Sequence, residues 1–452
     1  MKTPMRHLQR FLLAVTLLLP ASISAQNELG LSLIEGDYLL GSRLTPATLN
    51  LGEKNVEIVT SAYLWAGNTT LEYGLVTDYL DGRLMSAADK EDFLRFTNED
   101  NNLLGFGLTG MPLGVAFRVA RETDYPVDIS LSLTERMGMS LDFSEKLLEL
   151  MFYGNKRFAG QTIQVGPLDL NANQLREYAI GAAAPILPEG NNDWLTHLRA
   201  GLRLKFLQGI YSVYMPGSDV EMTTSADGRY IDFDFDYGIN LAGAGSDYQF
   251  FNGVGFGVGV DLSVAAEFTR SISASLSVLD IGGVRYRDNT LRYEERGFQR
   301  YDGLYFGGLF GDDDLENLDT LIYVFEPEEV EGADYRMPLP SRMVLQGKWN
   351  ITEDEEYPSE VSLTYIQGFN NMPGATVRPF VNVGYRQGVT EWFDVAASLG
   401  LGGYNNLSVG TYLAFRIDGV AGIYFGFDNL TGLVVPRRAS GADLMAGGML
   451  RF

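Results

Sequence analysis

The sequence predicts an all-β protein, a transmembrane outer-membrane β-barrel of about 14 antiparallel strands (roughly 12–16). Many stretches of the 452-residue chain alternate apolar and polar side chains with a period of two, as strands with unlike faces do. After the first 25 residues, no run of about 18 apolar residues occurs that could form a membrane helix. The mean hydropathy of −0.03 is expected when one face of each strand meets lipid and the other faces a wet lumen.

Composition and charge exclude several classes of protein. Hydrophobic residues make up 46% of the chain, which is enough for a packed structure rather than disorder. The absence of cysteine excludes disulfide frameworks, thiolate metal sites and cysteine nucleophiles. Because 58 acidic residues outnumber 34 basic ones, nucleic acid is not expected as a partner, since its phosphates would be repelled.

Residues 1–25 predict a cleaved signal peptide. A basic start leads into the apolar stretch 11–20, and the small residues of 21–25 suit cleavage after Ala25. The apolar stretch is too short to span a bilayer. We therefore expect the protein to be exported and to reside in the outer membrane of a Gram-negative cell.

The alternating windows are the main evidence for membrane strands. Four of the clearest are 127–134, 198–207, 231–241 and 253–264, where aliphatic and aromatic residues occupy one face and charged or small residues the other. Windows of about 9–12 residues match a tilted strand that crosses a bilayer, whereas strands in soluble proteins average about 5–6 residues. Only a closed barrel satisfies the backbone polar groups of such strands in hydrocarbon. Similar patterns occur at 55–65, 68–77, 102–109, 112–120, 174–184, 271–281, 340–350, 358–368, 377–387, 391–401, 404–415, 419–427 and 443–452.

The last window carries a second, independent indication of a barrel. Every second residue from Leu444 to Phe452 is apolar or glycine, and the chain stops on the aromatic residue. This pattern resembles the closing-strand signal that the outer-membrane assembly machinery recognises. We therefore expect Phe452 to be an assembly signal and the barrel to occupy residues 55–452. Short turns are expected at 110–112, 269–271 and 402–403.

Two inserts interrupt the strand pattern. At 142–154, Asp142 and Glu145 resemble a capping box and leucines follow at helical spacing, so we expect a short helix. It either plugs the lumen, lies at the periplasmic rim or is an ordinary amphipathic insert. Residues 287–339 are expected to form a long surface loop, whose segment 311–334 holds ten acids and no base. Carboxylates suit calcium, but the spacing does not match an EF-hand loop, so a solvated surface loop is favoured over a calcium site.

Evidence for enzyme chemistry is weak. Gly255, Gly257 and Gly259 keep a period of two with no helix after them, so they predict small lumen-facing residues rather than a dinucleotide-binding loop. A Ser–His–Asp hydrolase would have to use His197, since the other histidine lies in the predicted signal peptide, and no motif supports it. We expect no enzyme, no catalytic residue, no cofactor and no metal site.

Charges on two predicted strands form a candidate site inside the barrel. Three bases share one face of 198–207, and three aspartates share one face of 231–241, the next long strand. If these strands pair, the charges would form a cross-strand ladder that either closes the lumen with ion pairs, the favoured interpretation, or selects solutes electrostatically. Alternatively, the aspartates lie above the membrane, in a strand extended into a long loop. The six residues are Arg199, Arg203, Lys205, Asp232, Asp234 and Asp236.

Two neighbouring motifs carry a family resemblance. Residues 257–262 read G-V-G-V-D-L, and residues 275–282 read S-L-S-V-L-D-I-G before the V-R-Y of 284–286. This succession resembles an uncharacterised family of Bacteroidota outer-membrane proteins, a domain of unknown function. That family is similar to FadL-like long-chain fatty-acid transporter barrels and to porin-like shuttle proteins of the type IX secretion system. The segment 45–47 is similar to the N-P-A turn near the start of those barrels, with Thr45 in place of the asparagine.

The resemblance covers about 26–452 and implies a 14-stranded barrel whose N-terminal segment, 26–54, is a hatch inside the lumen. It carries over no binding residue, because its motifs specify strands and turns. The implied function is passive transport of a hydrophobic or amphipathic solute, in a barrel surrounded by outer-membrane lipid. The alternative is a plugged barrel that presents its loops to a secretion or surface-assembly partner. A continuous apolar path would favour transport, and a filled lumen would favour the partner role.

Overall fold

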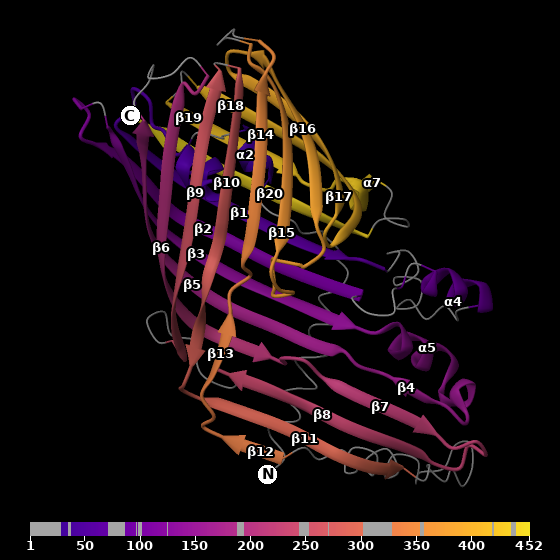
Figure 1. Ribbon diagram of the computed structural model, residues 1–452. Helices are drawn as coiled ribbons and strands as arrows, with labels where there is room; N and C mark the ends of the chain where they lie inside the picture. Colours follow the sequence, from indigo (N-terminus) through magenta and orange to yellow (C-terminus); the bar gives the residue numbers. More distant parts are fainter. Residues whose placement is uncertain are drawn as a thin grey trace.

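Within the residues that the computed structural model describes, 14 strands form a closed antiparallel barrel (Figure 1). Each strand pairs with the next, and β20 pairs with β1 from Arg451–Glu57 to Gly441–Gly67, which closes the ring. The predicted fold class and strand number are confirmed. The barrel strands are β1 (Val56–Asn68), β2 (Asn102–Val119), β3 (Val127–Phe143), β5 (Leu168–Leu187), β6 (His197–Tyr214), β9 (Gly255–Thr269), β10 (Ile272–Tyr286), β14 (Arg342–Asn350), β15 (Ser359–Gly368), β16 (Phe380–Thr390), β17 (Phe393–Gly402), β18 (Asn405–Ile417), β19 (Ala421–Phe427) and β20 (Gly441–Arg451). The structure describes residues 29–34, 38–70, 86–95, 97, 102–123, 125–187, 194–243, 253–269, 271–301, 328–352, 357–417, 420–434 and 440–452.

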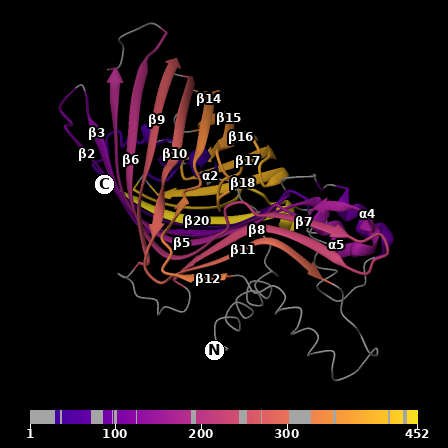
Figure 2. The same cartoon turned by 60° about the horizontal axis from the view of Figure 1, so that its bottom comes forward.

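Five further strands form a sheet at the end of the barrel opposite the C-terminus, which we call the side sheet (Figures 1 and 2). They are β4 (Thr162–Gln164), β7 (Asp219–Thr224), β8 (Ile231–Ala242), β11 (Thr290–Tyr301) and β12 (Glu328–Glu331). The side sheet joins the wall where β8 pairs with the last residues of β6, Ser212–Tyr214. A short strand, β13 (Tyr335–Pro338), extends the wall by pairing with β10.

Helices cover one face of the side sheet. Leu147 and Leu150 of α5 (Glu145–Tyr153) pack with Phe158, Ile163 and Met222, so α5 is an amphipathic cover and does not plug the lumen. Its N-cap is Ser144, whose hydroxyl accepts from the Leu147 amide at 3.1 Å, and the predicted capping box at Asp142 is wrong.

Other helices in the described chain are short. Outside the N-terminal segment they are α4 (Ala87–Leu94), α7 (Thr431–Val434) and the single-turn η3 (Asn155–Phe158). None of the helices seen in these ranges is both long and apolar enough to span a membrane.

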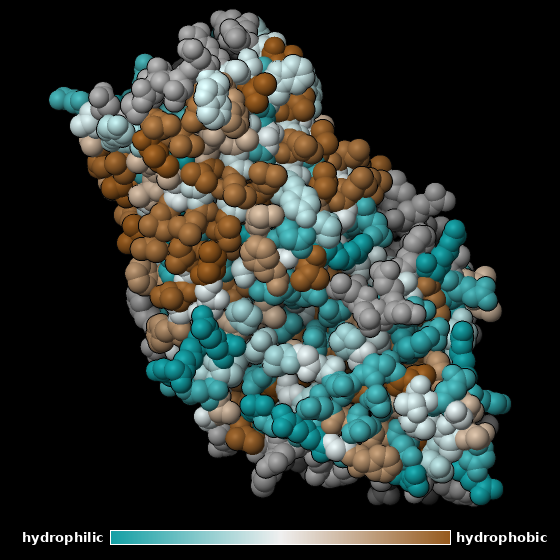
Figure 3. All heavy atoms as spheres, viewed as in Figure 1, coloured by the Kyte–Doolittle hydropathy of each residue, from teal (hydrophilic) through white to brown (hydrophobic). Residues whose placement is uncertain are grey.

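The barrel strands turn their apolar faces outward and their polar faces inward. In β6, Leu202, Leu204 and Phe206 are 40–54% exposed, whereas Arg199 and Lys205 are buried. Figure 3 shows the apolar side chains gathered over the upper part of the wall and hydrophilic ones over the part that holds the side sheet. An outward apolar surface with buried charges is the arrangement expected of a membrane-spanning barrel.

Three details of the predicted layout are wrong. The expected turn at 110–112 is a bulge inside β2, which pairs with both neighbours on either side of it. The window 231–241 is β8 of the side sheet and not a barrel strand. Within the expected surface loop 287–339, the described residues form strands β11, β12 and β13. The predicted signal peptide, most of the acidic segment 311–334 and most of the window 68–77 lie outside the described residues.

Candidate functional site: the plugged lumen

The N-terminal segment occupies the lumen, and we call its described part, 29–34 and 38–54, the plug. It contains α2 (Leu29–Ile34) and the single turns η1 (Gly41–Arg43) and η2 (Pro46–Thr48). Figure 2 shows α2 enclosed by the strands, where it contacts β16, β17 and β18, while η2 contacts β5, β6 and β9. Because both ends of the plug touch opposite parts of the wall, the plug crosses the lumen. Its buried apolar side chains are Leu33, Ile34, Leu39, Leu40, Leu44, Ala47, Leu49 and Leu51.

Basic side chains of the wall hold the plug by its backbone. Arg199 of β6 donates to the carbonyl oxygens of Ala47 at 3.1 Å and of Leu49 at 2.6 Å. Lys348 of β14 donates to the Ser32 carbonyl at 3.1 Å. Two more arginines donate in the same way, Arg203 to the Arg43 carbonyl at 3.3 Å and Arg416 to the Ile34 carbonyl at 3.0 Å. Charge-assisted bonds to carbonyls fix a segment regardless of its side chains.

An aspartate at the other end of the plug gathers several donors. Asp428, just after β19, accepts from the Gly30 amide at 3.0 Å, from the Tyr63 hydroxyl at 3.1 Å and from the Tyr412 hydroxyl. Its own amide donates to the carboxylate of Asp443 in β20. The start of α2 is therefore tied through Asp428 to β1, β18 and β20, on the side of the barrel where the ring closes.

Two glycines allow the plug to approach closely. A Cβ atom at Gly201 of β6 would lie 2.7 Å from the Cα of Ala47, and one at Gly30 would enter the ring of Tyr412. No larger residue fits at either position without movement of the plug or the wall.

A buried ion-pair network lines the lumen beside the plug. The Nζ atom of Lys205 in β6 lies 2.7 Å from a carboxylate oxygen of Asp280 in β10 and 2.8 Å from one of Asp261 in β9. A guanidinium nitrogen of Arg203 lies 2.7 Å from a carboxylate oxygen of Asp261, and one of Arg136 in β3 lies 2.8 Å from a carboxylate oxygen of Asp280. The network is completed by two residues, Glu177 of β5, 3.2 Å from Arg136, and Arg342 of β14, 3.2 Å from Asp280. Four bases therefore surround three carboxylates in the described lumen.

A β-bulge in β10 directs the carboxylate of Asp280 into the lumen. Asp280 has a φ of 58°, and the pairing of β10 with β9 shifts register at this point. Its amide donates to Asp261 at 2.7 Å, so the two aspartates fix one another. Bulges redirect side chains in this way without breaking the sheet.

The six residues of the predicted charge ladder do not form one ladder. Arg199, Arg203 and Lys205 face the lumen as expected, but their partners are Asp128, Asp261 and Asp280. The predicted partners lie in β8, which meets β6 only at its far end, so the predicted pairing is wrong. The reason is topological, because the chain leaves the wall after β6 to form β7 and β8 before it returns as β9.

Two of the three aspartates instead face arginines across the side sheet. Asp232 pairs with Arg300 at 2.6 Å and Asp236 with Arg296 at 3.1 Å, while Asp234 lies opposite Phe298. The hydrogen bond from Arg300 lowers the pKa of the Asp232 carboxyl. All three aspartates therefore lie in the side sheet, outside the closed ring of 14 strands.

The motifs that carried the family resemblance contain residues of the network. Asp261 is the aspartate of the first motif and Asp280 that of the second. Sequence reasoning missed Arg136, Glu177 and Arg342, because they come from three different strands and only the closed barrel brings them together.

Two further predicted residues lie at the end of the barrel that carries the C-terminus. His197 begins β6, with its Nδ1 3.9 Å from Glu267. Phe452 is exposed, and its amide donates to the Val56 carbonyl at 2.9 Å, so it closes the ring between the first and last strands.

The fold and the filled lumen define the class of this protein, a plugged antiparallel β-barrel. The chain belongs to the family of unknown function DUF5723, which matches residues 46–428. No curated protein sequence matches it.

The solved structures to which the chain is similar include two toluene transporters and a FadL homologue. The toluene transporter TbuX of Ralstonia pickettii is 10% identical, with 91% of this chain and 93% of that chain covered and a TM-score of 0.44. The toluene transporter TodX of P. putida is 9% identical, with 91% and 94% covered and a TM-score of 0.42. A FadL homologue of Pseudomonas aeruginosa is 10% identical, with 95% and 98% covered and a TM-score of 0.40.

Proposed function

We propose that this protein is an exported outer-membrane barrel that passes an amphipathic solute through its lumen when the plug moves. The observation that carries the proposal is the two-sided lining of the lumen. One side holds the ion-pair network of β3, β5, β6, β9, β10 and β14. The other side carries an apolar and aromatic cluster that the plug leucines fill, in addition to the ion pairs of Arg451 with Glu57 and of Arg416 with Asp394. The side chains of the cluster are Tyr63, Trp65, Met111, Tyr404, Tyr412, Tyr424, Met445 and Met449.

A small cavity lies where the two sides meet. It has a volume of about 70 Å³ and is lined by Tyr63 and Trp65 on one side and by Arg136, Lys205 and Asp280 on the other. Withdrawal of the plug would uncover the apolar side next to the charges, a lining that suits a molecule with one apolar and one polar end. The plug contacts described above are hydrogen bonds and apolar packing, which can be broken and remade.

The exposed apolar surface of the wall would contact outer-membrane lipid, and Phe452 would act as the assembly signal. A Phe452→Ala variant should then accumulate less folded barrel in the membrane than a variant of another exposed aromatic, Trp392→Ala. Equal yields of the two variants would remove the special role of the last residue.

An engineered disulfide tests whether plug movement opens the lumen. The Ala47 amide donates to the Ser263 hydroxyl at 2.6 Å, so an Ala47→Cys/Ser263→Cys variant places two cysteines side by side. The chain has no cysteine of its own, so this pair cannot mispair. Proteoliposome swelling should be measured with arabinose and with hexanesulfonate, a small amphiphile that crosses bilayers poorly.

Oxidation and reduction of the same sample provide the matched control. We expect hexanesulfonate to enter when the pair is reduced and to be blocked when it is oxidised. Deletion of 26–54 should open the lumen to both solutes. Absence of swelling in the reduced pair and in the deletion would refute gated transport.

The filled lumen also favours a second candidate, a plugged barrel that presents its loops to a secretion or surface-assembly partner. The cavities that lie against the plug in the described lumen are small, about 70 and 80 Å³. Such a protein would lose its co-purifying partners when 287–339 is replaced by a short linker. Retention of every partner would dispose of this role.

A further inference from the structure

A much larger pocket lies outside the lumen, on the side sheet. Its volume is about 570 Å³, within the range of about 300–1,000 Å³ typical of small-molecule sites. Its walls come from β4, β7, β8 and β11 and from the connections before β5 and β7. Because four hydrogen-bonded strands carry most of the lining, the pocket has a rigid frame.

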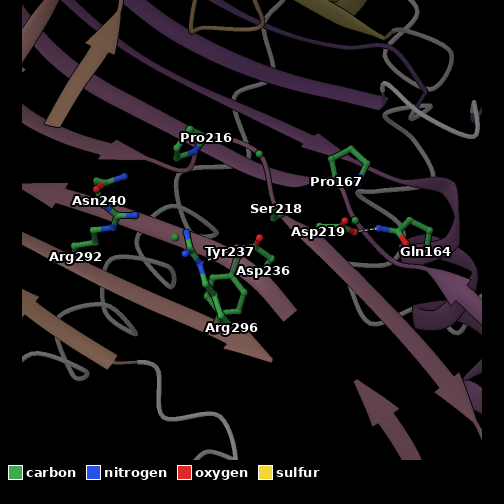
Figure 4. A pocket seen from close by; sticks show the side chains of 13 residues that line it. Gln164, Pro167, Pro216, Ser218, Asp219, Asp236, Tyr237, Asn240, Arg292 and Arg296 are labelled. Atoms are coloured by element: carbon green, nitrogen blue, oxygen red, sulfur yellow. Dashed lines mark hydrogen bonds and ion pairs between the residues drawn. The ribbon is translucent and has the colours of Figure 1, made fainter. Parts of the chain in front are cut away.

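The lining offers hydrogen-bonding groups of both kinds. In Figure 4, Asn240 and Arg292 lie at one end of the pocket, Gln164 and Asp219 lie at the other, and Arg296 lies between them. The Gln164 amide donates to the Asp219 carboxylate, and Arg296 pairs with Asp236. Amides, carboxylates and guanidinium groups together provide donors and acceptors along the whole pocket.

The charges of the lining cancel. Arg292 pairs with Glu294, Arg296 pairs with Asp236, and Asp219 accepts from the Gln164 amide. Because each charged group of the lining already has a partner, the pocket favours neither an anion nor a cation. Tyr237 adds an aromatic ring to the lining, and two prolines add small apolar surfaces. A ligand that fits must be neutral, must donate and accept hydrogen bonds at many points, and must offer apolar C–H faces.

We propose that this pocket binds a neutral saccharide. Each sugar hydroxyl both donates and accepts a hydrogen bond, and the ring faces carry C–H groups that can pack on tyrosine and proline. The pocket opens at the end of the barrel opposite the C-terminus, where a glycan from solution or the glycan chain of a membrane lipid could reach it. The site is independent of solute transport through the lumen.

Two cross-strand ion pairs supply the test and its matched control. Asp236→Ala/Arg296→Ala removes one ion pair from the pocket without a change in net charge. Asp232→Ala/Arg300→Ala removes the equivalent pair of the same two strands, away from the pocket. Calorimetry with the purified full-length barrel should use cellohexaose, maltohexaose and chitohexaose as soluble probes. Micelles of smooth lipopolysaccharide and of lipid A form the second arm.

We expect at least one saccharide to bind, and the pocket variant to bind it at least about tenfold more weakly, as loss of two charge-assisted hydrogen bonds predicts. The control variant should bind within twofold of the wild type. Binding of smooth lipopolysaccharide but not lipid A or the soluble probes would assign the glycan to a membrane lipid. Failure of all probes that carry sugar chains, or equal weakening in both double variants, would overturn the proposal.

Discussion

The contact between the plug and Gly201 leads to a sharp prediction for a single methyl group. In Gly201→Ala, the new Cβ would lie 2.7 Å from the Cα of Ala47 and closer still to the neighbouring plug backbone. Carbon atoms pack at about 3.5–4.0 Å, so η2 would have to move away by about 1 Å. That movement would break the hydrogen bond from Ala47 to Ser263 and lengthen both bonds from Arg199.

The size of the effect follows from the cost of overpacking. Extra atoms forced into a packed site cost about 1–3 kcal/mol. If the whole cost falls on the seated plug, its equilibrium with the displaced state shifts by about 5- to 150-fold. Amide exchange of residues 38–54 should speed up by that factor, and swelling with hexanesulfonate should rise.

Hydrogen exchange followed by mass spectrometry checks this prediction. The control is Gly347→Ala, a strand glycine of β14 where an added Cβ meets no atom within 4 Å. Unchanged exchange of the plug in Gly201→Ala, or equal acceleration in both variants, would show that the plug does not rest on the wall at Gly201.

Three further predictions concern charged groups. In Arg199→Met, the buried Asp128 keeps only Arg118 as an ion-pair partner, and the plug loses two hydrogen bonds. The free energy of unfolding in urea titrations should therefore fall by about 3 kcal/mol. No change would contradict the described ion pair. Asp428→Asn keeps the shape of the site but weakens the hydrogen bond from the Gly30 amide. Amide hydrogen exchange in α2 should therefore accelerate about fivefold. Unaltered exchange would show that this hydrogen bond does not hold α2 in place. The pKa of Asp232 is lowered in the folded protein, so the stabilisation by its ion pair is present above the ordinary aspartate pKa and is lost as pH falls through the lowered value. An NMR titration should give a lower pKa for Asp232 than in a variant without its arginine partner, and equal values would count against the pair.

The strands were predictable because each strand alternates outward apolar and inward polar residues within its own sequence. Leu202, Leu204 and Phe206 are exposed while Arg199 and Lys205 are buried, and this alternation is visible in the sequence without knowledge of any neighbour. The same alternation places these bases on the buried face of β6.

Their partners were not predictable, because pairing depends on which strands become neighbours. The next alternating window after β6 is β8, yet the neighbour of β6 in the wall is β9. Nothing in the period-two pattern distinguishes a strand of the closed ring from a strand of the side sheet, so Asp232, Asp234 and Asp236 were assigned first to the barrel wall, with a strand extended into a long loop as the alternative. The contacts of the plug were out of reach for a similar reason, since most use backbone carbonyls, which every residue has.

The unequal length of the wall has a consequence for the evolution of the family. β5 has 20 residues and β17 has 10, so one flank of the barrel is about 33 Å longer than the other along the strands. The connections after β3, β6 and β10 all leave from the end that carries α5 and the side sheet. Insertions there would lengthen the rim that carries the side sheet, whereas insertions at the opposite end would fall beside the C-terminal residue that closes the ring. Relatives of this chain should therefore differ in length chiefly after β3, β6 and β10, and new binding surfaces in the family should arise at those three points.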